Sequence, residues 1–250
     1  MPNVIGRDLL TDCTGIPISL TAGEYAAPVI VVIGSPVGQL QDEDLVAAGT
    51  AARVALAAAS AGRSVQLVGR TGDDRATDGL LLRLARAGVG HVALLRDAAS
   101  PTPLGIQPTI DDADLLSEDG PEAPPVGPPV ERAESPILDA ADVELGLRYL
   151  TEFAVLVLAE PAGLDVIAAV AEAARWNAAR LVMVVEAGTA APDGLPSDAI
   201  VFEAPADDRD GVFATLVGTF AAALDDGEDP AGAFRSSIAA EGWTAATPDA

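Results

Sequence analysis

Short runs of β-branched residues alternate with longer alanine-rich segments along most of the chain. The runs have the composition of strands buried on both faces of a sheet, and the longer segments have the length and glycine stops of helices. A helix between two such strands favours parallel pairing, so the pattern predicts an α/β fold with a mostly parallel sheet. The predicted strands are residues 27–34, 64–69, 91–95, 154–159, 180–186 and 199–202, and the predicted helices are 42–61, 77–87, 140–150, 163–179, 211–225 and 229–240.

The size of the chain is consistent with one large domain. Its 250 residues are 50% hydrophobic and only 4% aromatic, which suits helices packed closely on a sheet. We therefore expect a single domain over residues 1–250. Prolines and acidic residues dominate the stretch before residue 136, which predicts an exposed loop at about 111–136. A weak strand is expected just before it, at residues 104–110.

The charge of the chain argues against several classes of partner. The formal net charge is -24, and all 14 basic residues are Arg, so we expect neither nucleic acid nor membrane as a partner. The only Cys is Cys13, and no CxxC or HExxH spacing is present, which argues against a metal site. The first residues lack the apolar core of a signal peptide, and cytoplasmic localisation is expected.

Residues 48–74 contain an ordered set of features that characterises a known family. A glycine-rich entry at Gly49 is followed by an alanine-rich helix, a turn, a strand, and the sequence Gly72-Asp73-Asp74. These features resemble the first signature of the ribokinase-like carbohydrate kinases, also called the phosphofructokinase B family. The resemblance covers most of the chain and implies a three-layer α/β/α fold.

Residues 208–240 are similar to the catalytic loop and final helices of that family. In active members a glycine-rich loop opens the helix and binds phosphate, and its last Asp removes the proton from the acceptor hydroxyl. Asp208 matches the first Asp of that loop and Gly211 its first Gly. Phe213, however, stands at the second Gly and Ala214 at the base. A shifted alignment places Gly211 at the base position instead, so neither alignment provides a catalytic Asp.

The sugar-binding positions that the resemblance implies are also altered. Val37 and Gln39 stand where the family has sugar-contacting Asn and Asp, and Arg53 replaces the usual Asn. Residues 37–48 also form too short a segment for the β-hairpin lid of many relatives, so we expect the lid to be reduced or absent. The candidate ligand-binding residues are Gly34, Ser35, Gln39, Gly49, Arg53, Asp208 and Gly211, and no catalytic or metal-binding residue is assigned.

Structural roles compete with functional ones at several of these positions. Asp207, Asp208 and Asp210 precede a predicted helix, where short acidic side chains cap free N–H groups. Arg53 lies on an alanine-rich helix and is either a solvated edge residue or the best candidate for binding an anionic ligand. Structural roles are also expected for the Asp73-Asp74 turn, His91, Trp176 and Trp243.

Two functions of different classes remain from the sequence. The first is a ribokinase-like protein that has lost sugar kinase activity, a pseudokinase with a ligand-binding or self-associating role. That reading needs no cofactor, and it allows a homodimer through a free sheet edge and a small-molecule ligand of unknown identity. The alternative is a divergent carbohydrate or small-molecule kinase that uses ATP and Mg, with Asp208 or Asp210 as the base.

Overall fold

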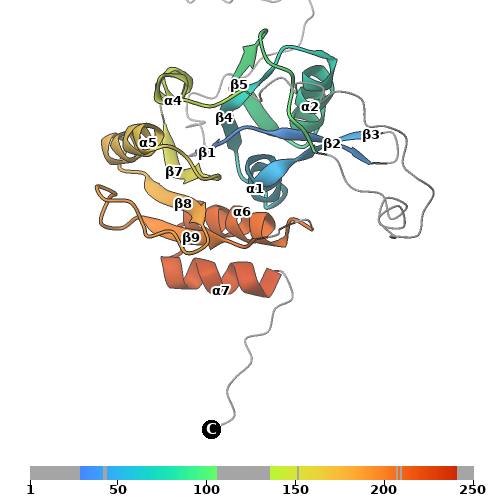
Figure 1. Cartoon of the computed structure of the whole chain (residues 1–250). Helices are drawn as coiled ribbons and strands as arrows, with labels where there is room; N and C mark the ends of the chain where they lie inside the picture. Colours follow the sequence, from blue (N-terminus) through green and yellow to red (C-terminus); the bar gives the residue numbers. More distant parts are fainter. Residues whose placement is uncertain are drawn as a thin grey trace, which may run out of the picture.

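The computed structural model describes residues 29–41, 44–105, 136–150, 152–206, 208 and 210–240. Within these residues, a six-stranded sheet forms the centre of the molecule (Figure 1). Its strand order is β5-β4-β1-β7-β8-β9, and every neighbouring pair is parallel, as the sequence predicts. The strands are β1 (Val29–Ile33), β4 (Val65–Gly72), β5 (Val89–Asp97), β7 (Phe153–Leu158), β8 (Arg180–Glu186) and β9 (Ile200–Ala204).

The order of the strands fixes where a ligand site is expected. From β1 the chain adds β4 and β5 on one side, then crosses to add β7, β8 and β9 on the other side. The direction of winding therefore reverses between β1 and β7. In open α/β sheets, ligands bind at such a reversal, outside the carboxyl ends of the strands.

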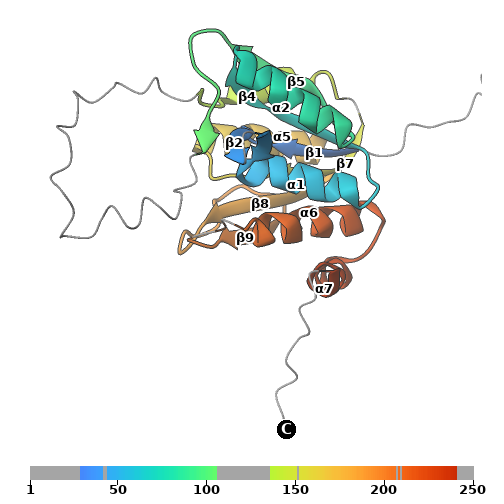
Figure 2. The same cartoon turned by 90° about the vertical axis from the view of Figure 1, so that its right-hand side faces the viewer.

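Helices cover both faces of this sheet. Figure 2 looks onto the face covered by α1 (Gly49–Ser60), α2 (Arg75–Arg86) and α6 (Val212–Asp225), with α7 (Pro230–Ala240) packed against α6. The other face carries α4 (Ala140–Leu147) and α5 (Leu164–Trp176). Each face has its own buried apolar cluster, because strands such as β1 are buried on both sides. The result is the expected three-layer α/β/α arrangement.

The segment before α1 differs from the sequence prediction. The predicted helix 42–61 begins only at Gly49, and the residues before it form β3 (Asp44–Ala48), which pairs antiparallel with β2 (Val37–Gln41). The segment, expected to be too short for the β-hairpin lid of many relatives, therefore forms a short hairpin. Gly49 adopts a φ of 77°, and this left-handed residue lets the strand turn directly into the helix. Alanines on both sides of Gly49 concealed that boundary in the sequence.

A second, small sheet results from this hairpin. It has three strands in the order β3-β2-β6 within the described residues, and β6 (Leu104–Gly105) lies parallel to β2. The lid is thus reduced rather than absent. The remainder of the predicted strand 104–110, the loop to residue 135 and Cys13 lie outside the described residues.

Two further observations concern the surface. Trp176 at the end of α5 is 88% exposed, so it does not have the packing role that was expected of it. None of the helices in the described ranges has the length and hydrophobicity to cross a membrane.

Candidate functional site

The loop before α6 places a carboxylate over the start of that helix. Asp208 accepts hydrogen bonds from the backbone N–H groups of Phe213, at 2.9 Å, and Ala214, at 3.1 Å. The first N–H groups of a helix have no partner within the helix, so the carboxylate satisfies two of them and interacts favourably with the helix dipole. Asp208 therefore caps α6, as the structural reading of the sequence predicts.

Arg53 and Gly211 shape the same loop. Nη1 of Arg53 donates a hydrogen bond to the backbone carbonyl of Asp208 at 2.9 Å. Gly211, the N-cap residue of α6, has a φ of 73°, and a Cβ placed on it would lie 2.6 Å from Nη1 of Arg53. Only glycine fits both the backbone conformation and the space. The structure thus joins three candidate residues, and Arg53 supports the backbone of the loop.

Neither position that the family alignment assigns to a base carries an acid in the folded chain. Ala214 is fully buried in α6, and Gly211 has no side chain. Phe213 packs edge-on against Phe202, with 6.4 Å between the ring centroids. The start of α6 is therefore bordered by an aromatic pair instead of a second glycine.

The Gly72-Asp73-Asp74 sequence has a structural role. Asp74 caps α2 by accepting a hydrogen bond from the N–H of Thr77 at 3.0 Å, and it also accepts one from the N–H of Thr102 at 2.9 Å. Partial burial opposes ionisation, but the hydrogen bonds from Thr102 and Thr77 outweigh it and lower the pKa of Asp74 to about 2. Asp73 forms an ion pair with Arg96 at 3.0 Å.

A second group of residues lies at the winding reversal of the sheet. Gly34 and Ser35 follow β1, and Glu160 follows β7, its parallel neighbour. The backbone N–H of Ser35 donates to Oε1 of Glu160 at 2.8 Å. Burial raises the pKa of Glu160, and the hydrogen bond from Ser35 only partly offsets this effect. The carboxyl group is therefore held among protein atoms at the place where this fold class binds ligands.

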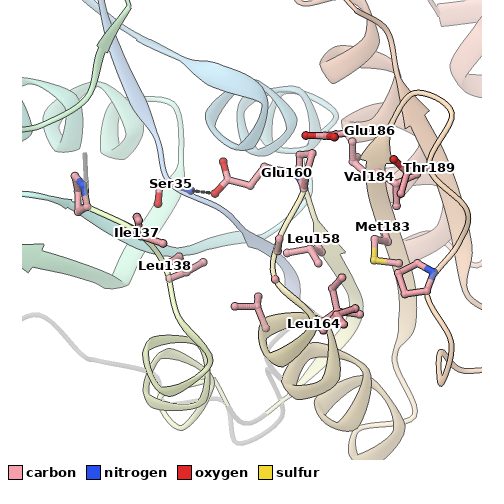
Figure 3. Close-up of a pocket in the computed structure, with 18 of the residues that line it drawn as sticks. Ser35, Ile137, Leu138, Leu158, Glu160, Leu164, Met183, Val184, Glu186 and Thr189 are labelled. Carbon is pink, nitrogen blue, oxygen red and sulfur yellow. Dashed lines mark hydrogen bonds between the residues drawn. The ribbon is translucent and has the colours of Figure 1, made fainter. Parts of the chain in front are cut away.

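Glu160 and Ser35 line a cleft of about 800 Å³ (Figure 3). Its walls are mainly apolar and come from the entry to α4, the start of α5 and the end of β8. The crossover from β8 to β9, residues 187–199, contains no helix, although parallel strands are usually joined by one. Thr189, Ala190 and Pro192 of that crossover line the cleft directly.

The remaining candidate residues lie outside this cleft. Gln39 is in β2 of the small sheet, opposite Val46, and Gly49 packs against Val37. Sequence reasoning missed Glu160. The sequence does show that an acid follows a buried strand closely. Its importance could be recognised only by knowing that this strand neighbours β1, and the sequence does not give strand order.

Comparison with known proteins identifies the fold. No protein-family model and no curated protein sequence matches the chain. Among solved structures, ribokinase from Arabidopsis thaliana, in complex with ribose and ATP, is similar with a TM-score of 0.55 and 16% identity, over 86% of this chain and 91% of that one. Phosphofructokinase-2 from Escherichia coli, in a tetrameric inhibited form, has a TM-score of 0.57 and 13% identity, over 86% and 93% of the two chains. The chain therefore has the fold of the ribokinase-like carbohydrate kinases.

Proposed function

We propose that this protein is a ribokinase-like pseudokinase that binds a small molecule and does not phosphorylate it. The observation that carries the proposal is that neither aligned base position, Gly211 or Ala214, holds an acid, while the carboxylate of Asp208 accepts the N–H groups of Phe213 and Ala214 at the start of α6. The resemblance implies that active relatives use this helix start to bind phosphate.

Occupation by an internal carboxylate weakens phosphate binding in two ways. The N–H groups that a phosphate oxygen would need already have a charged acceptor, and charge-assisted hydrogen bonds of this type are the stronger ones. The negative charge of Asp208 also repels a triphosphate. Phosphoryl transfer depends on positioning and on stabilising charge, so both effects act against the chemical step.

The absence of a base adds to the effect. Gly211 and Ala214 occupy the two aligned base positions, and the loss of one general base lowers a rate by about a hundredfold to ten-thousandfold. The missing base affects removal of the proton from the acceptor hydroxyl, and the occupied helix start affects stabilisation of the phosphate charge. The two losses therefore act on different parts of the transition state. Efficient sugar phosphorylation is not expected from this combination.

Ligand binding has separate support. The cleft at Ser35 and Glu160 lies at the winding reversal of the sheet, and its lining residues include neither Asp208 nor the first turn of α6. The structurally similar Arabidopsis ribokinase was solved with ribose and ATP, so the fold accommodates small molecules. We therefore assign the retained function to this cleft.

The test combines nucleotide binding with an activity assay. Isothermal titration calorimetry with ATP and Mg²⁺ is expected to give no binding at micromolar concentrations, and a coupled assay for ADP is expected to give no release with a panel of sugars and polyols. Micromolar ATP binding together with polyol-dependent ADP release would refute the proposal and support the divergent kinase. In that case Asp208→Ala and Asp210→Ala would identify the base.

A further inference from the structure

The polar groups of the cleft point to the chemical class of its ligand. Glu160 and Glu186 contribute carboxylates, and none of the described residues that line the cleft is basic. The start of α5 also borders the cleft, but its first turn carries Asp165, which offsets the positive end of the helix dipole. An anionic ligand would therefore meet negative charge with no cation to pair with it.

The hydroxyl group of Ser35 lacks a partner in the described part of the chain. Its Oγ is buried, although its backbone N–H donates to Glu160. A buried polar group without a hydrogen bond costs about 1 to 3 kcal/mol, so such groups are uncommon unless a ligand or water provides the missing hydrogen bond. Ser35 thus offers an acceptor and a donor beside the carboxyl group of Glu160.

The mouth of the cleft exposes large apolar side chains. Ile137 is 76% exposed and Leu164 is 77% exposed, and both line the same cleft as the buried Leu158 (Figure 3). A ligand with an apolar body would cover these side chains and gain the free energy of removing that surface from water. A sugar would place several of its hydroxyl groups against these walls without hydrogen-bond partners.

We infer that the cleft binds a small organic amine with an apolar body. The ammonium group pairs with Glu160 and donates a hydrogen bond to Oγ of Ser35, and the body lies against Ile137, Leu158 and Leu164. Pairing with an ammonium group also compensates the desolvation of the Glu160 carboxylate. This inference rests on the proposed ligand-binding function and names the class of ligand.

Three probes of equal chain length separate the contributions of charge and of apolar contact. Hexylamine, hexan-1-ol and hexanoate are titrated into the full chain in mildly alkaline buffer and followed by calorimetry. Hexylamine is expected to bind about tenfold more tightly than hexan-1-ol, since a charge-assisted pair is worth at least that factor. Hexanoate is expected to show no binding. Because no nucleotide is used, a negative result in this experiment does not bear on the proposed loss of phosphoryl transfer.

Variants locate the site and correct for nonspecific attraction of cations to this acidic protein. Glu160→Gln keeps the size of the side chain and is expected to reduce hexylamine affinity to that of hexan-1-ol. Leu164→Ala, at a position that is 77% exposed, is expected to weaken both ligands. Glu172→Gln, an exposed acid on α5 outside the cleft, removes the same charge and should leave hexylamine affinity unchanged. Equal binding of hexanoate, equal loss in Glu160→Gln and Glu172→Gln, or no binding of any probe would overturn the inference.

Discussion

Removing the Asp208 side chain tests the central feature of the proposed function. Asp208→Ala deletes an acceptor that binds two backbone N–H groups at 2.9 and 3.1 Å. The loss of a helix cap costs about 0.5 to 2 kcal/mol, and a charged acceptor with two bonds lies at the upper end, at about 2 kcal/mol. For a chain of this size, that corresponds to a fall in Tm of about 4 to 8 °C.

The stability assay needs a control that removes the same charge from the same loop. Asp210 is exposed and close in sequence, so Asp210→Ala corrects for general repulsion in a chain with a net charge of -24. Thermal and urea unfolding followed by circular dichroism are expected to place Asp208→Ala well below Asp210→Ala. Equal stability of the two variants would refute the capping role.

The same variant also tests whether the helix start is a latent anion site. Without the carboxylate, the N–H groups of Phe213 and Ala214 are available to an external anion. Sulfate at about ten times its Kd would then stabilise Asp208→Ala by about 1.4 kcal/mol. The wild type and Asp210→Ala measure the general stabilising effect of sulfate, which is subtracted. No additional stabilisation of Asp208→Ala would mean that Asp208 does not block a phosphate site.

Three further predictions concern stability. Arg63→Met leaves the buried Asp225 carboxylate without its ion-pair partner, which lies 2.6 Å away. Urea titrations are expected to show a free energy of unfolding that is lower by about 3 kcal/mol, and a loss below about 1 kcal/mol would contradict this. Gly218→Ala places a Cβ 2.4 Å from the carbonyl oxygen of Val54, where α6 packs against α1. The free energy of unfolding should fall by about 2 kcal/mol in the same titrations, and unchanged stability would show that the helices can move apart. Asp74 has a lowered pKa of about 2, so its contribution of about 1 to 2 kcal/mol is present above pH 4 and is lost as the pH falls from about 4 to 2. Unfolding of Asp74→Asn should lack this part of the pH dependence, and parallel curves for the two proteins would contradict the assignment.

The prediction of the fold from the sequence depended on the length and composition of each segment. Strands such as β1 and β8 are recognisable because they are buried on both faces and therefore consist of uninterrupted apolar runs. The boundary between β3 and α1 was not recognisable. Alanine occurs on both sides of Gly49, and pairing with β2, a tertiary contact, decides where the strand ends.

The sequence by itself determined the six strands of the main sheet, their parallel pairing and the absence of an acid at the two aligned base positions, because each of these depends on local composition or on identity at one position. The sequence left open whether Asp208 and Arg53 bind a ligand or support the loop, and only the tertiary structure decided this and placed Glu160 beside Ser35. Glu160 and Ser35 are 125 residues apart in the chain. They meet because β1 and β7 are parallel neighbours at the winding reversal, and strand order depends on packing between distant segments.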